Sequence, residues 1–145
     1  MTRFLTTAAI AALLAAPALA EGGKTKVLTI LTAPEPQTQL MAMVLTMNAV
    51  AAGAEASVLL CGPAGDIALK DAPATATEGQ PPKGASPKGL LSKMIAEMSV
   101  KAEVCAIYLP GKGADASILM DGVTAASPSA KGAEIADGAT QILSF

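Results

Sequence analysis

The chain has 145 residues, with 12 acidic and 10 basic residues and no histidine; 52% of its residues are hydrophobic but only 2% are aromatic. The positive charges are scattered rather than grouped, so the sequence has no electrostatic footprint for nucleic acid. The absence of histidine excludes Ser-His-Asp and Cys-His catalysis and every zinc or copper site that uses histidine.

The first twenty residues have the pattern of a cleaved secretory signal. Arg3 provides a positive start, an apolar run covers 4–16, and Ala18-Leu19-Ala20 forms a cleavage motif before Glu21. The apolar run is shorter than the roughly 20 residues that a membrane-spanning helix needs. We therefore expect one exported, periplasmic domain over 21–145, with no membrane anchor after cleavage.

Short β-like runs alternate with stretches of helical spacing along this domain. In chain order we predict a strand at 26–32, a helix at 37–52, a strand at 55–61, a turn of helix at 64–69, a helix at 89–100, a strand at 103–109, a short helix at 115–120, a weak strand at 122–127, a helix at 128–137 and a strand at 140–145. This alternation predicts an α/β fold with a mainly parallel sheet of about five strands, covered on both faces. Residues 70–88 are rich in Pro, Gly and Ala and predict a flexible loop, either functional or disordered.

Two cysteines, Cys61 and Cys105, have the clearest chemical potential. Sites in open α/β sheets form beyond the carboxyl ends of the strands, and Cys61 ends its predicted strand at that edge. Cys105 is the third residue of its predicted strand, so its thiol lies either at the edge or below it. The residues alone leave three interpretations open: a small buried side chain, a disulfide between the two cysteines, or a reactive thiol. Lys112 is the nearby cation that would stabilise a thiolate.

Methionines and aspartates are weaker candidates. Thioethers together with thiols suit Cu(I), but Met41, Met94 and Met98 fall on the apolar faces of predicted helices, where we expect them to fill the core. Four aspartates are interpreted as solvated turn residues and helix caps: Asp66, Asp71, Asp115 and Asp121. We predict no metal and no organic cofactor.

The element order and one local pattern resemble the DsrE/DsrF-like family, which includes the TusD-type sulfur-relay proteins. In this pattern the strand cysteine, Cys105, is followed by Lys112-Gly113, by Gly122-Val123 and by the terminal hydrophobic stretch 142–145. The resemblance covers nearly the whole domain. It implies a three-layer α/β/α sandwich of flavodoxin-like topology that assembles into trimers or hexamers. It also implies that Cys105 carries sulfur as a persulfide between donor and acceptor proteins.

Two functional hypotheses follow from the residues and the resemblance. In the first, the chain is a sulfur carrier or sulfurtransferase, in which Lys112 stabilises the Cys105 thiolate and Cys61 is a second thiol or disulfide partner. This chemistry requires no histidine, metal or organic cofactor. In the second, the chain is a non-catalytic oligomeric binding module that uses the strand-edge cleft and the 70–88 loop, with both cysteines structural or disulfide-bonded.

Overall fold

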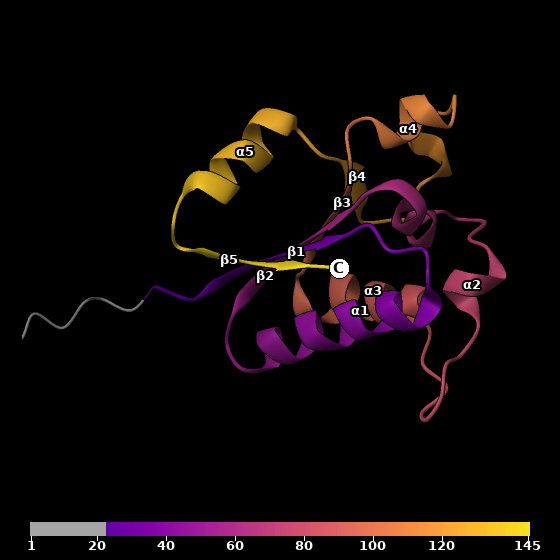
Figure 1. Cartoon of the computed structure of the whole chain (residues 1–145), viewed down its shortest axis with the longest axis horizontal. Coiled ribbons are helices and arrows are strands. Elements are labelled where there is room, and N and C mark those ends of the chain that lie inside the picture. Colours follow the sequence, from indigo (N-terminus) through magenta and orange to yellow (C-terminus); the bar gives the residue numbers. More distant parts are fainter. Residues whose placement is uncertain (1–22) are drawn as a thin grey trace, which may run out of the picture.

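The computed structural model describes residues 23–145, so the predicted signal at 1–20 and its cleavage site lie outside the described residues. A five-stranded sheet lies between two layers of helices (Figure 1). Within residues 23–145, no helix is long and apolar enough to cross a membrane. The elements in chain order are β1 (Lys26–Leu31), α1 (Pro36–Ala51), β2 (Glu55–Leu60), η1 (Gly62–Ala68), α2 (Ala74–Thr77), α3 (Pro87–Met98), β3 (Lys101–Val104), α4 (Tyr108–Gly111), η2 (Ala116–Ile118), β4 (Val123–Ala125), α5 (Pro128–Ala136) and β5 (Thr140–Ser144).

All the strand pairings in this sheet are parallel, and the strand order is β4-β3-β2-β1-β5. The predicted three-layer α/β/α fold with about five parallel strands is therefore confirmed. In this order β1 lies between β2 and β5, whereas the flavodoxin sheet has the order 2-1-3-4-5. The reason is the path of α5, which runs on the face opposite α1 and α3 and returns the chain to the far side of β1 (Figure 1).

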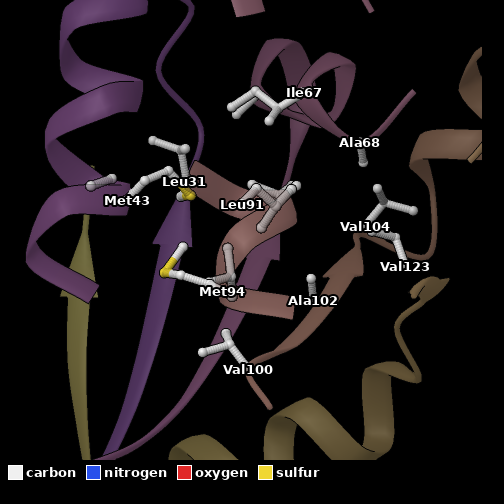
Figure 2. Close-up of a cluster of buried hydrophobic side chains, with 14 of the residues drawn as sticks. Leu31, Met43, Ile67, Ala68, Leu91, Met94, Val100, Ala102, Val104 and Val123 are labelled. Carbon is white, nitrogen blue, oxygen red and sulfur yellow. The ribbon is translucent and has the colours of Figure 1, made fainter. Parts of the chain in front are cut away.

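The main core fills the layer between the sheet and α1, α3 and η1 (Figure 2). Aromatic residues are scarce, so aliphatic and methionine side chains fill this layer. Met94 is fully buried, as predicted. The prediction for Met41 is wrong: its side chain is 50% exposed, because α1 turns Ala42, Met43 and Thr46 toward the sheet instead. Met98 is only partly buried at the edge of the core.

The predicted strand at 103–109 is wrong in its extent. β3 ends at Val104, which pairs with Leu60, the last residue of β2. The chain then turns, and the amide of Tyr108 donates to the carbonyl of Cys105 at 2.9 Å. A longer strand would have no neighbour in β2, because β2 is already followed by η1. The apolar residues after Cys105 therefore belong to a turn and to α4.

Residues 70–88 have more local structure than the predicted loop. They include α2 and a tight turn in which the amide of Gln80 donates to the carbonyl of Ala85 at 2.7 Å. The ammonium of Lys88 donates to the carbonyls of Leu69 and Lys70 at 2.6 and 2.7 Å. These bonds tie the start of α3 to the residues that follow η1.

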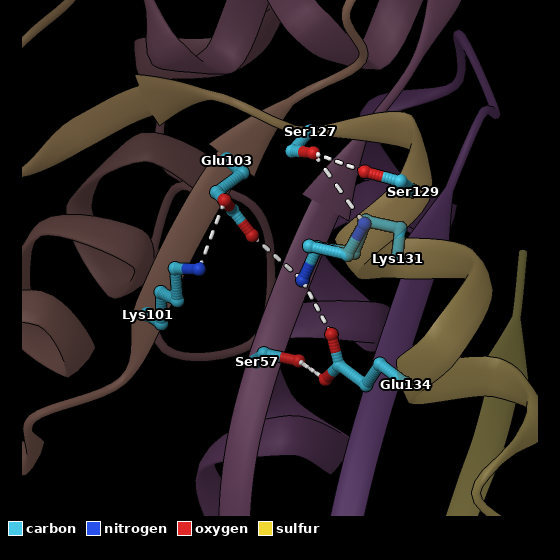
Figure 3. A network of polar contacts seen from close by, with 8 residues as sticks. Ser57, Lys101, Glu103, Ser127, Ser129, Lys131 and Glu134 are labelled. Atoms are coloured by element: carbon cyan, nitrogen blue, oxygen red, sulfur yellow. Dashed lines mark hydrogen bonds and ion pairs between the residues drawn. The ribbon is translucent and has the colours of Figure 1, made fainter.

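Buried ion pairs hold α5 on the second face of the sheet (Figure 3). Lys131 on α5 and Glu103 on β3 are 6% and 5% exposed, and their charged atoms lie 2.6 Å apart. Lys131 also pairs with Glu134 at 2.8 Å. Glu134 in turn accepts a hydrogen bond from the hydroxyl of Ser57 at 2.6 Å. On the other side, Lys101 pairs with Glu103 at 3.0 Å. Burial lowers the pKa of Lys131, but hydrogen bonds to Glu103 and Glu134 outweigh it and raise that pKa. The lysine therefore stays charged beneath the helix.

We predict that Lys131→Met lowers the free energy of unfolding by about 3 kcal/mol, because it leaves the buried Glu103 carboxylate with one partner fewer. Lys93→Met is the matched control, since Lys93 pairs with Glu97 at 3.9 Å on an exposed helix face and should change stability little. Urea unfolding at neutral pH, followed by the fluorescence of the single tyrosine, measures both. Equal losses in the two variants would contradict a stabilising role for the buried pair.

Candidate functional site

The two cysteines lie side by side at the carboxyl edge of the sheet. Cys61 follows β2 directly and Cys105 follows β3 directly. The amide of Cys105 donates to the carbonyl of Leu60 at 2.9 Å, and the amide of Cys61 donates to that of Leu31 at 2.9 Å. The sheet hydrogen bonding thus continues one residue past each strand. It brings the two Cα atoms to 5.1 Å, and the cysteines form a disulfide.

The disulfide lies on the face of the sheet that carries α5. Side chains alternate between faces along a strand, so Cys105 shares the face of Glu103, whose carboxylate meets Lys131 on α5. Both cysteines pack against the small apolar cluster on this face and are only partly buried. Of the two positions considered for Cys105, the structure has the one at the edge, because β3 is shorter than the predicted strand.

Three polar side chains from the loops after β2 and β3 meet beyond the disulfide. The hydroxyl of Tyr108 donates to Asp66 Oδ1 at 2.7 Å, and Lys112 Nζ lies 2.7 Å from the same oxygen. The Lys112 ammonium is also 5.4 Å from the centre of the Tyr108 ring. Lys112 therefore lies in the loop that follows Cys105, as expected, with its charge directed at a carboxylate.

Tyr108 and the contact of Asp66 are features that sequence reasoning missed. Asp66 was interpreted as a turn residue, whereas Asp115 does act as a cap, accepting the amide of Ser117 at 2.8 Å. Tyr108 packs across η1, where a side chain at Gly65 would collide with its ring. The sequence does hold one signal for this contact: Asp66 closely follows Cys61, Tyr108 closely follows Cys105, and the two cysteines end neighbouring strands.

Two cavities lie among the loops after β2 and β3, and the strongly exposed Ile107 borders both. The first, here called the outer cavity, has a volume of about 430 Å³ and is lined by Gly62, Pro63, Asp66, Ile107, Tyr108, Gly111 and Lys112. The second, here called the α5 cavity, has a volume of about 200 Å³ and is lined by Leu59, Cys105, Ala106, Ile107, Ala126, Pro128 and Lys131. Cys105 therefore borders a hollow that a small molecule can enter.

Acidic and cysteine side chains in the described part of the chain do not gather into a group of three or more that could hold a metal ion. The buried Met43 and Met94 belong to the core, on the face of the sheet away from the disulfide. The cysteine pair at the carboxyl edge offers thiol and disulfide chemistry.

The sequence matches no protein-family model and no curated protein. Two solved structures share the fold: the protein of unknown function MTH1491 from Methanobacterium thermoautotrophicum, with a TM-score of 0.62 and 14% identity, and the YchN protein from E. coli, with a TM-score of 0.60 and 17% identity. Each match covers 85% of this chain and 100% of the solved chain. The chain is thus a three-layer α/β/α protein with a cysteine pair at the carboxyl edge of its sheet, and its function must be argued from that site.

We predict that Tyr108 ionises well above its ordinary pKa of 10.0, because burial, the hydrogen bond to Asp66 and the charge of Asp66 all raise its pKa. Asp66→Asn should bring the pKa down toward 10.0, while the exposed Asp121→Asn should leave it unchanged. Tyr108 is the single tyrosine and the chain has no tryptophan, so an alkaline ultraviolet titration reports this residue alone. Titration of the folded wild-type protein near 10.0 would contradict the contact with Asp66.

Proposed function

We propose that this chain is a DsrE-like sulfur carrier that acts in the periplasm and holds sulfur as a persulfide on Cys105, with Cys61 as its resolving thiol. One observation supports this proposal above the others: Cys61 and Cys105 end neighbouring strands with their Cα atoms 5.1 Å apart. Two thiols within bonding distance can take up a sulfur atom, hold it and release it by thiol–disulfide exchange alone. The resemblance to the DsrE/DsrF-like family points to the same residue.

The loading step begins from the reduced pair. The Cys105 thiolate attacks the outer sulfur of a donor persulfide, R–S–SH, so that a new S–S bond forms at Cys105 and the donor leaves as its thiol. Transfer onward is the same reaction in reverse, with an acceptor thiolate attacking the outer sulfur. No electron is gained or lost overall, so the cycle needs neither metal nor organic cofactor.

The polar group beside the pair supports a modest role for Lys112. Its ammonium is shared with Asp66 at 2.7 Å, so only part of its field is available to a thiolate at Cys105. Asp66 and Tyr108 fix the position of the ammonium through bonds of 2.7 Å to one carboxylate oxygen. We assign Lys112 the role of a positioned cation that favours the charged form of Cys105.

We predict that the reduced protein gains one sulfur atom from glutathione persulfide, and that the sulfur is on Cys105. Cys61→Ser should gain the same sulfur, whereas Cys105→Ser should gain none, because only Cys105 is proposed to carry it. Intact mass before and after treatment measures this directly. Sulfur on Cys61 would contradict the assignment of Cys105 as the carrying residue. No uptake by any variant would overturn the carrier and leave the disulfide with a structural role.

A second candidate function, an oligomeric binding module, is favoured by a separate observation on α1. An apolar cavity of about 550 Å³ lies between α1 and the turn at 80–85, and it is lined in part by Leu40, Met41, Val44 and Leu90. Met41 in this lining and Leu45, one turn further along α1, are 50% and 44% exposed. Exposed apolar surface of this kind marks sites of association. The resemblance suggests further copies of this chain as the occupant, in a trimer or hexamer.

We predict that Leu45→Glu reduces the oligomer to smaller species, because it places a charge in the apolar contact between copies. Ala133→Glu, at an exposed position on α5, is the matched control and should leave the assembly intact. Analytical ultracentrifugation of both variants and the wild type measures the effect. A wild type that sediments as a monomer, or equal effects of the two changes, would contradict the assignment of this surface.

A further inference from the structure

The α5 cavity borders Cys105 but not Cys61. In the strand order β4-β3-β2, Ala126 follows β4 and Cys61 follows β2, so the two flank Cys105. The amide of Ala126 donates to the carbonyl of Val104 at 2.8 Å, and this bond holds Ala126 beside the residue that precedes Cys105. Ala126 and Pro128 line the cavity together with Cys105, while Cys61 does not line it.

Access through the α5 cavity selects which sulfur of the disulfide is attacked. A nucleophile breaks a disulfide by approaching one sulfur in line with the bond, on the side away from the other sulfur. A nucleophile in the α5 cavity meets Cys105, because Cys61 does not line it, and attack on Cys105 Sγ makes Cys61 the leaving group. The outer cavity includes neither cysteine among its lining residues, so it offers no comparable route.

The size and walls of the cavity select the nucleophile. Its volume of about 200 Å³ lies below the roughly 300–1,000 Å³ of cavities that bury drug-sized ligands. Its walls include the apolar side chains of Leu59, Ala106 and Ile107. The one charged lining residue, Lys131, is already paired with Glu103 and Glu134. A cavity of this volume has room for a sulfur species with a single heavy atom.

We propose that the α5 cavity admits inorganic sulfide and that hydrosulfide attacks Cys105 Sγ of the disulfide. A bond forms between the entering sulfur and Cys105 Sγ as the bond to Cys61 Sγ breaks. The products are the Cys105 persulfide, which keeps the proton of hydrosulfide, and the Cys61 thiolate, which takes the negative charge. The disulfide itself is the oxidant: it is reduced at Cys61 while the sulfide becomes sulfane sulfur. This inference rests on the proposed function, since it names a sulfur source for the same persulfide.

The test uses the oxidised full-length mature protein and a limiting amount of sodium sulfide in the absence of oxygen. Intact mass after alkylation should show the gain of one hydrogen sulfide per chain. Tryptic peptides then locate it, because Lys70 and Lys101 separate the two cysteines. We expect the extra sulfur on Cys105 and a free thiol on Cys61. Cys61→Ser and Cys105→Ser, which cannot form this disulfide, should gain nothing from sulfide.

A pair of cavity variants tests the route. Ala106→Leu narrows the α5 cavity, and Gly111→Leu narrows the outer cavity at a position where an added side chain meets nothing within 4 Å. We expect Ala106→Leu to slow sulfide capture by about tenfold and Gly111→Leu to leave it nearly unchanged, because access to the attacked sulfur limits exchange. Equal rates in the two variants would overturn the route.

The outcomes separate this inference from the proposed function. Extra sulfur found on Cys61, or no gain from sulfide by the oxidised protein, overturns the inference. If the reduced protein still loads Cys105 from glutathione persulfide, the carrier function stands and only the sulfide route fails. If neither treatment loads Cys105, both fail. The location of the sulfur by peptide mapping needs no substituted protein and so does not depend on whether a variant folds.

Discussion

The parallel pairing of β2 with β3 is the constraint on which the site depends. Leu60 pairs with Val104, and the hydrogen bond from the Cys105 amide to the Leu60 carbonyl extends that register one residue further. A slip of one residue would turn the Cys105 side chain to the opposite face of the sheet. The disulfide, the α5 cavity and the meeting of Tyr108 with Asp66 all follow from two strands that end at the same level.

Different interactions hold the helices on the two faces of the sheet. Aliphatic and methionine side chains cover the face under α1 and α3, where burial of apolar area stabilises the packing (Figure 2). The other face carries the nine-residue α5, held by Lys131 between Glu103 and Glu134 (Figure 3). A short helix anchored by charges covers only part of the sheet. That partial cover leaves Cys105 at the wall of a cavity rather than inside a core.

Likeness of fold and chemistry of site make separate contributions to the functional argument. MTH1491 and YchN share the fold at 14% and 17% identity, and at this level the likeness extends to the fold alone. Function is therefore argued from the cysteine pair, which can exchange sulfur without any cofactor. The disulfide is compatible with both a carrier and a structural role, and the two differ in what reaches Cys105. A cavity against that residue favours the carrier.

The sequence by itself determined the elements whose signals are local. Apolar spacing and Pro and Gly punctuation located α1 at Pro36–Ala51 and β5 at Thr140–Ser144 within one residue or so of the prediction, and Ser127 begins α5 as its cap. Only the tertiary structure decided where β3 ends, since a strand stops where its neighbour stops. It also decided the strand order, the disulfide and the contact between Tyr108 and Asp66. These features join residues more than 40 positions apart, and their geometry comes from register and crossover, which no local pattern encodes.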